Sequence, residues 1–390
     1  MRKVPIILFF FLTCGCEMIV DVEVPFEGEQ LVVNSFVRPD SLWSARVSSN
    51  RFILTHDSLW YKMIENATVI VVDENGPVAT LQHVSEGMYR AQNEKPEVGR
   101  HYTLQVSAPN YPSVEAKSII PSATTIESVE IEKAFRDGDP TEIIKVKFTD
   151  NAATKDFYHI RLEKREEYYN PYGDDPDQIS SVLSPHPDII SDNPQLNAQL
   201  VQVDGGLLVK DVLFNGKQTE VQIRMEYYYY PSYFAGLRVI LRSVSEDYYN
   251  YMVTKDLQDR TGGDPFAQPV NAYNNVAKGF GIFAGLNSST LEWINPEQPV
   301  ITEFSPTSGQ EGDVITITGQ NFTNDFGQQT VDVKFNGPDG ERIWVHWDQI
   351  TDVTETQLKV VVPPGATTGK LMVSRGACAS VSDVEFQVID

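Results

Sequence analysis

The sequence predicts an all-β protein made of tandem immunoglobulin-like β-sandwich domains, with one helix in the middle domain. Three observations predict this class. Short stretches of alternating apolar and polar residues recur along most of the chain, as in half-buried strands. Turn sequences such as Asn-Gly lie between strand-like stretches. Residues 245–260 alone repeat their apolar residues at the spacing of a helix.

Residues 1–15 have the features of a lipoprotein signal peptide. Arg2 and Lys3 precede an apolar run that is roughly half of the 18 or more residues needed to span a bilayer. Gly15 supplies the small residue that lipoprotein signal peptidase requires before the modified cysteine. We therefore expect cleavage before Cys16 and lipid attachment to Cys16. An ordinary secreted protein, cut nearby, is the alternative.

The composition excludes some classes of partner. The chain has 390 residues, with 31 Lys and Arg against 54 Asp and Glu, giving a net charge of -23. Such a surface repels nucleic acid, so no nucleic-acid partner is expected. Hydrophobic residues make up 41%, which favours a folded body over an acidic disordered tail. Cys14 leaves with the signal peptide and Cys16 carries lipid, so only Cys378 remains. No intramolecular disulfide can then form, and Cys378 is expected to be buried.

The folded part begins after a short tether. Residues 16–30 are acidic and connect the lipid to the first domain, an N-terminal β-sandwich at residues 31–121. Alternating strands are predicted from residue 31, at residues 68–73 and at residues 101–107, with a hairpin turn at Asn75 and Gly76. Three prolines between residues 109 and 121 then end the domain.

The middle β-rich domain, residues 122–296, is less regular. Strand patterns occur in TEIIKVKFTD, DFYHIRLEKREEYY, VQIRMEYYYY and LRVILRSV. Residues 170–199 are polar and rich in proline and aspartate, which predicts a long exposed loop. In the helix at residues 245–260, Tyr249, Val253 and Leu257 recur at spacing four and are expected to pack against a sheet.

The last domain, residues 297–390, has the clearest alternation. Five strands in about 90 residues predict an immunoglobulin-like sandwich. The positions expected to face its core are Ile315, Ile317, Val331, Val333, Phe335, Leu358, Val360, Val362, Leu371, Val373, Val384, Phe386 and Val388.

One segment of this domain resembles a known domain family. The stretch SPTSGQEGDVITITGQNF has the Ser-Pro, spaced glycines, alternating isoleucines and Gly-x-Asn-Phe of the IPT/TIG immunoglobulin-like domain. Pro-Pro-Gly at residues 363–365 also fits. The resemblance implies a fold and no particular function, because such domains occur in receptors, enzymes and transcription factors.

The rest of the chain resembles a Bacteroidota family of outer-membrane lipoproteins that is described only as a domain of unknown function. The motifs that carry the resemblance are CEMIVDVEVP, LVVNSFV, SEDYYNYM and GDPFAQPVNAYNNVAKGFGIFAG. It implies an outer-membrane location and genes near TonB-dependent transporters, and it carries over no catalytic residue. In lipoproteins of this type, acids after the cysteine, here Glu17, Asp21 and Glu23, imply display on the cell exterior.

No catalytic motif is present in the sequence. It contains no zinc-binding His or Cys pattern, Gly-x-Ser-x-Gly elbow, Walker loop or dinucleotide fingerprint, so a non-enzyme is expected. Gly279 to Gly285 are interleaved with large apolar residues, which favours a strand or buried turn. Tyr228, Tyr230 and Tyr233 could offer flat rings to a sugar or peptide, or could simply fill a core and cover a sheet.

A calcium site is the one cofactor that we consider. Asp137, Asp139 and Glu142 could supply its oxygen ligands, as could three aspartates between residues 174 and 177. The spacing is not that of an EF-hand loop, so solvated loop acids are the alternative.

The predicted function is that of a non-enzymatic surface lipoprotein, held in the outer membrane by lipid on Cys16. We expect it to assist a TonB-dependent transporter in nutrient capture. An adhesin or glycan-binding module that uses the tyrosines is the alternative, and a structural spacer without ligand is a third hypothesis.

Overall fold

The computed structural model describes most of the chain. The residues that it describes are 28–51, 62–136, 139–169, 179–186, 189–191, 200–203, 205–225, 234–261, 268, 270–323, 329–376 and 378–389. No helix among them is long and apolar enough to cross a membrane.

The first domain is a curved, mostly antiparallel sheet around one core. Its strands are β1 (Leu31–Val37), β2 (Ser44–Ser49), β3 (Thr68–Asp73), β4 (Gly76–Ser85), β5 (Met88–Arg90), β6 (His101–Ser107), β7 (Val114–Ile119), β17 (Val276–Ala277) and β18 (Phe280–Ile294). The predicted hairpin turn lies between β3 and β4, where Asp73 pairs with Gly76. Trp43, Tyr89 and Tyr102 are fully buried in the core because alternate residues of each strand point inward.

Residues from much later in the sequence complete the first domain. Strand β17 pairs with β7, and the first part of β18 pairs in parallel with β1. The pairing needs glycines: a Cβ on Gly281, at φ +114°, would lie 2.0 Å from the carbonyl oxygen of Val33. Residues 276–285, which the sequence analysis assigned to the middle domain, therefore belong structurally to the first domain.

The middle domain is a sandwich of two sheets. Its strands are β8 (Ile126–Arg136), β9 (Asp139–Thr149), β10 (Phe157–Tyr169), β11 (Ile179–His186), β12 (Ile189–Ser191), β13 (Leu200–Val203), β14 (Gly206–Lys210), β15 (Gln218–Met225) and β16 (Gly236–Val244). One sheet has the order β12-β15-β9-β8, and the other continues from β18 through β16, β10 and β14 to β13. Phe148, Tyr158 and Phe214 are among the side chains buried between them.

Strand β11 pairs with β10, and β11 and β12 lie within residues 170–199. The prediction of one long loop there was wrong. Ile179, Ile190 and their neighbours extend the two sheets instead, because backbone pairing with β10 and β15 is available to them.

The one helix of the described residues, α1 (Glu246–Thr261), begins one residue later than predicted. The hydroxyl of Ser245 accepts a hydrogen bond from the backbone N–H of Tyr248 at 3.3 Å and so caps the helix. Tyr248 and Tyr249 are buried against β10 and β18, whereas Leu257 is 46% exposed. The predicted stripe therefore packs only in its first half.

The C-terminal domain is a separate two-sheet sandwich. Its strands are β19 (Val300–Ser305), β20 (Ser308–Gly309), β21 (Val314–Gln320), β22 (Asp332–Asn336), β23 (Arg342–Trp344), β24 (Ile350–Thr351), β25 (Gln357–Val361), β26 (Gly369–Arg375) and β27 (Cys378–Val388). The predicted inward positions are buried, with two departures: Val384 is 54% exposed and Val388 is half-buried. A bulge explains Val384: the register slips between Lys370 and Met372, and the Ser382 hydroxyl accepts the Leu371 N–H. Cys378 is buried, as expected.

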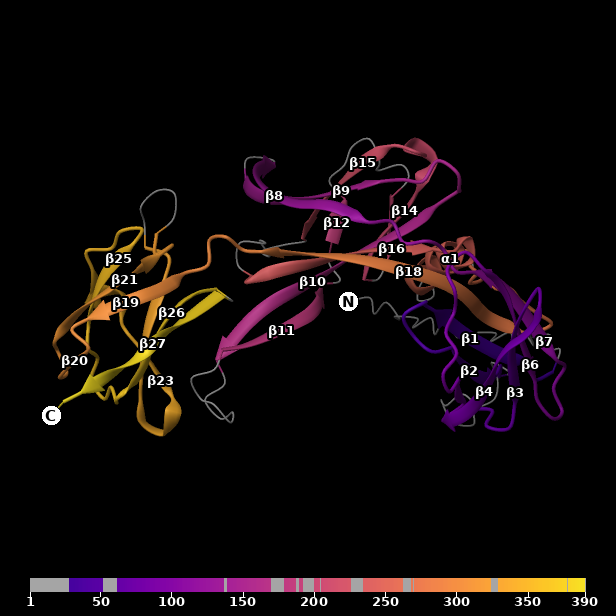
Figure 1. Cartoon of the computed structure of the whole chain (residues 1–390), viewed down its shortest axis with the longest axis horizontal. Helices are drawn as coiled ribbons and strands as arrows, with labels where there is room; N and C mark the ends of the chain where they lie inside the picture. Colours follow the sequence, from indigo (N-terminus) through magenta and orange to yellow (C-terminus); the bar gives the residue numbers. More distant parts are fainter. Residues whose placement is uncertain are drawn as a thin grey trace, which may run out of the picture.

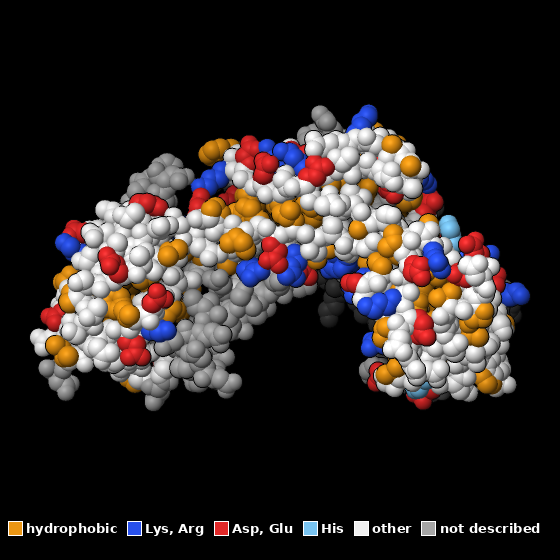
Figure 2. All heavy atoms as spheres, viewed as in Figure 1, with side chains coloured by type: hydrophobic (Ala, Val, Ile, Leu, Met, Phe, Trp, Pro, Cys, Tyr) orange, Lys and Arg blue, Asp and Glu red, His pale blue; other side chains and the backbone are white. Residues whose placement is uncertain are grey.

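The three domains form an arch (Figure 1). The first sandwich lies at one end and the C-terminal sandwich at the other, with the middle domain between them. Strand β18 spans two domains, since its first part pairs with β1 and residues 286–294 pair with β16. Figure 2 shows Lys and Arg side chains gathered along the concave side of the arch.

Candidate functional site

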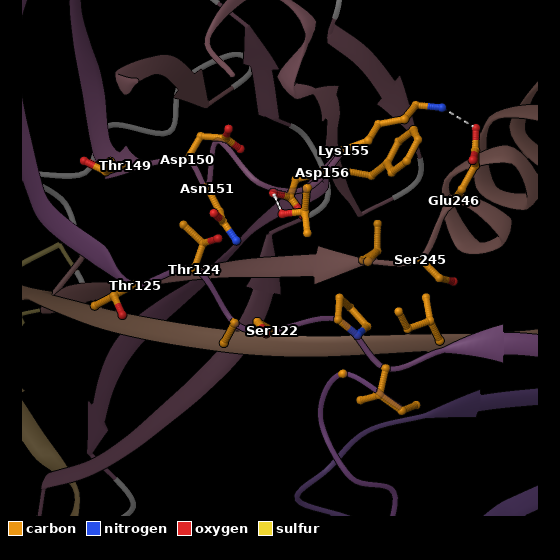
Figure 3. A pocket seen from close by; sticks show the side chains of 18 of the residues that line it. Ser122, Thr124, Thr125, Thr149, Asp150, Asn151, Lys155, Asp156, Ser245 and Glu246 are labelled. Atoms are coloured by element: carbon orange, nitrogen blue, oxygen red, sulfur yellow. Dashed lines mark hydrogen bonds and ion pairs between the residues drawn. The ribbon is translucent and has the colours of Figure 1, made fainter. Parts of the chain in front are cut away.

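A groove of about 700 Å³ lies where the first and middle domains meet. Three segments form it: the linker from β7 to β8, the loop from β9 to β10, and the start of α1 (Figure 3). Its lining residues are Gly99, Ile119, Ile120, Pro121, Ser122, Ala123, Thr124, Thr125, Glu127, Thr149, Asp150, Asn151, Thr154, Lys155, Asp156, Phe157, Val244, Ser245 and Glu246. A cavity of this size at a domain junction is typical of a small-molecule site.

The groove combines an apolar part with many polar groups. Ile119 and Pro121 are partly exposed there, and the buried side chains of Ile120, Phe157 and Val244 lie behind them. The polar groups are hydroxyls, an amide, carboxylates and one ammonium group; Ser122, Thr125 and Asn151 are exposed. Such a surface can donate to and accept from a ligand that carries several hydroxyl groups.

Two aspartates of the groove lining, Asp150 and Asp156, cluster with a third, Asp211, which does not itself line the groove. One carboxylate oxygen of each of Asp150, Asp156 and Asp211 lies within 4.8 Å of the others. Asp150 accepts hydrogen bonds from the hydroxyl of Tyr158 at 2.6 Å and from the backbone N–H of Gly216 at 2.8 Å. Both of its oxygens are therefore occupied, which makes Asp150 a structural anchor and a poor nucleophile.

The other two aspartates are linked through the backbone. Asp211 accepts the N–H of Asp156 at 2.8 Å, and Asp156 accepts the hydroxyl of Thr154 at 2.7 Å. Burial raises the pKa of Asp156, and the charges of Asp150 and Asp211 raise it further. The three groups could share a proton or hold a divalent cation.

The groove as a whole is acidic. Its lining carries Glu127, Asp150, Asp156 and Glu246 against one cation, Lys155. The Lys155 ammonium donates to Glu246 at 2.7 Å, so its charge is already compensated (Figure 3). An anionic ligand is disfavoured in such a site, whereas a neutral ligand is not repelled.

Glu142, whose side chain the structure describes, is the one predicted site residue that can be compared with this groove, and it does not line it. Cys16, Tyr228, Tyr230, Tyr233 and Asp137 lie outside the described residues. Of the other two calcium candidates, Asp139 begins β9 and its side chain is not described. Glu142 is 8% exposed and lies opposite Lys133 in the β8–β9 strand pair. The lipidation, tyrosine and calcium hypotheses therefore remain predictions.

The sequence analysis missed the aspartate cluster. Two of its members carried a usable pattern: Asp150 ends the strand pattern TEIIKVKFTD, and Asp156 begins DFYHIRLEKREEYY. Acids at the facing ends of consecutive strands are brought together when the loop between them is short. Asp211 carried no such pattern, because its partners come from a distant part of the chain.

The fold and groove define a multidomain β-sandwich protein with a cavity at the junction of two domains. The chain belongs to the family described as domain of unknown function DUF4249, whose profile matches residues 17–292. Residues 299–388 match the IPT/TIG domain. A comparison with curated proteins finds no match.

Solved structures show only weak similarity. One, described as a crystal structure with a xylogluco-oligosaccharide, is 14% identical, with 90% of this chain and 58% of that chain covered and a TM-score of 0.25. SGBP-B from a complex xyloglucan utilization locus in Bacteroides uniformis is 10% identical, with coverages of 68% and 50% and a TM-score of 0.21. The present chain thus spans 58% and 50% of the lengths of these two proteins. Likeness at this level carries no argument about ligands.

Proposed function

We propose that the protein is a non-enzymatic cell-surface module that binds a neutral glycan in the groove between its first two domains. The observation that carries this proposal is the lining of the groove, in which hydroxyls, an amide and carboxylates face the same space as an apolar patch. Sugars need both kinds of contact, because their hydroxyls hydrogen-bond and their C–H faces pack on apolar surface.

The charge of the groove narrows the class of glycan. With four acidic groups and one compensated lysine, the lining favours neutral sugars over uronic acids and sulfated sugars. Asp150 is buried and hydrogen-bonded on both oxygens, which disfavours it as the free catalytic carboxylate that a hydrolase needs at the scissile bond.

A blocking substitution tests the proposal. Titration calorimetry with a panel of neutral oligosaccharides should detect binding by the intact protein and at least about a tenfold loss in Ser122→Trp, whose indole would fill the groove. The matched control is Ser85→Trp, at an exposed position at the end of β4. Equal binding by Ser122→Trp and the wild type would place the glycan elsewhere. In that case Tyr228→Ala and Tyr230→Ala test the tyrosine platform instead.

Association with a TonB-dependent transporter is a second candidate function. Phe135 is 81% exposed near the tip of the β8–β9 hairpin and would offer a protein partner one apolar contact. We expect lipid on Cys16 to hold the protein in the outer membrane, so Cys16→Ala should move it to the soluble fraction. A mild-detergent pull-down from outer membranes should then recover a transporter in stoichiometric amount, and recovery of the lipoprotein alone would count against this function.

A further inference from the structure

A second cavity, of about 510 Å³, is lined by three arginines. Arg38 follows β1, Arg90 ends β5 and Arg242 lies near the end of β16, so separate segments bring the three guanidinium groups to one space. No acidic residue is among the described residues that line it. In a chain with a net charge of -23, this is a locally basic site.

Two of these arginines have no acidic partner. Arg38 forms an exposed ion pair with Asp40 at 3.2 Å. For Arg90 and Arg242, no ion pair with a carboxylate is found within the part of the chain that the structure describes. The buried Nε–H of Arg242 also makes no hydrogen bond there. A buried donor without a partner costs free energy, so the protein holds Arg242 here at some cost to its stability.

The neighbouring His159 also senses this charge. His159 is buried, its Nδ1 lies 2.9 Å from the hydroxyl of Tyr248, and its Nε2 has no partner among the described residues. Burial and, to a smaller extent, the positive charges of Arg242 and Arg161 together lower the pKa of His159 to about 3. The region behind the cavity is thus already positive and holds His159 neutral.

The cavity also has an apolar wall. Phe36 is 40% exposed, and its ring meets the ring of Tyr248 edge-on at 5.6 Å. Leu42 and Leu286 line the same space. A site that needed only to bind an inorganic ion would not require this surface, so the lining fits a ligand with an anionic group on an apolar ring face.

We propose that this cavity binds an acidic sugar through its carboxylate. Arg90 and Arg242 pair with the carboxylate, because a guanidinium group matches the two oxygens of a carboxylate in geometry and charge. The sugar ring lies on Phe36. Sulfate and phosphate esters share the anionic chemistry, and the test separates these sources. The proposal goes beyond the neutral-glycan function of the groove and does not depend on it.

The test is titration calorimetry of the full chain with trigalacturonate, its neutral counterpart galactotriose, a sulfated disaccharide, glucose 6-phosphate and inorganic phosphate. The wild type should bind trigalacturonate best, and more weakly as salt rises. Arg90→Gln and Arg242→Gln should each weaken this binding by at least about tenfold. Arg90 is exposed, so its variant is expected to keep the fold even where Arg242→Gln perturbs it.

Control variants separate the contributions. Lys117→Gln removes one positive charge from an exposed position on β7 outside the cavity and should leave the affinity unchanged. Phe36→Ala should weaken the binding of trigalacturonate and leave the binding of phosphate unchanged. Unchanged trigalacturonate binding in the Arg90 variant overturns the proposal. Phosphate, glucose 6-phosphate or the sulfated disaccharide bound as tightly as trigalacturonate overturns the assignment to a carboxylated sugar. Galactotriose tests the groove and not this cavity, so its failure to bind would count against the proposed function alone.

Discussion

Two cavities flank the end of β16, and their charges are opposite. The groove that Val244 helps to line carries four acidic residues and one paired lysine, whereas the cavity that contains Arg242 carries three arginines and no acid among its described lining residues. The two positions are two residues apart on one strand. Local charge, and not the net charge of -23, therefore decides which ligand each surface favours.

The difference also lies in how each set of charges is satisfied. The groove's Asp150 is held by the Tyr158 hydroxyl and the Gly216 N–H, so protein groups satisfy it. In the arginine cavity, the Nε–H of Arg242 is left without a partner among the described residues. Protein groups thus satisfy Asp150 on the acidic side, whereas on the basic side Arg90 and Arg242 have no carboxylate partner among the described residues.

The largest expected effect comes from breaking the acidic network. Tyr158→Phe removes the hydroxyl that donates to Asp150 and leaves a buried carboxylate short of one donor. The free energy of unfolding should fall by about 1–3 kcal/mol, measured by urea denaturation.

Tyr249→Phe is the control for this change. Tyr249 is also buried, at 5% exposure, and its hydroxyl has no hydrogen bond among the described residues, so loss of that hydroxyl should change stability by less than about 0.5 kcal/mol. Equal effects of the two substitutions would mean that Asp150 does not depend on Tyr158.

A pH dependence tests the basic side. The folded pKa of His159, about 3, lies below its ordinary value of 6.5, so the unfolded chain binds a proton first as pH falls. His159 does not affect the free energy of unfolding above about pH 6.5. Below that pH the free energy of unfolding falls, by roughly 2 kcal/mol at pH 5. Burial and the charges of Arg242 and Arg161 keep the ring neutral, and the Tyr248 hydroxyl contacts its Nδ1.

Substitution of His159 should remove this slope. His159→Gln should flatten stability between pH 7 and pH 5 relative to the wild type, as measured by urea denaturation at each pH. His346→Gln, at an exposed position, should leave the slope intact. A wild-type slope that survives in His159→Gln would assign it to other groups.

A smaller effect is expected at Asp156. Its raised pKa means that ionisation is disfavoured in the folded state, so stability declines as pH rises through the folded pKa. Asp156→Asn removes this repulsion and should stabilise the protein at pH 7 by on the order of 0.5 kcal/mol, since solvent screens a half-exposed group. The gain should vanish in acid, where the wild-type carboxyl is protonated. A loss of stability at pH 7 would show that the charge is needed there.

The sequence predicted the architecture better than the sites. Alternation placed the cores correctly because each strand shows one face to the interior, as at Ile315 and Ile317. It failed at Val384, where a bulge resets the alternation, and at β17 and β18, whose partners in the first domain lie far away in the sequence. Such pairings depend on the fold, which local patterns do not contain.

The residues of the two sites could not be predicted from the sequence for the same reason. Arg38, Arg90 and Arg242 are isolated in the sequence and meet only because β1, β5 and β16 converge. Asp211 likewise joins Asp150 and Asp156 through tertiary contacts. Residues adjacent in sequence drew attention, as Tyr228 and Tyr230 did, although sites are assembled from residues that are adjacent in space.

The most direct test of two oppositely charged sites is a simultaneous titration of the intact protein. Its two ligands would be a neutral oligosaccharide selected from the panel and trigalacturonate. The account predicts that each binds with one-to-one stoichiometry whether or not the other is saturating, and that only the acidic ligand weakens as salt rises from 50 to 500 mM, roughly the range over which screening becomes strong. Mutual exclusion, or equal salt dependence for the two ligands, would contradict the assignment of separate sites with opposite charge.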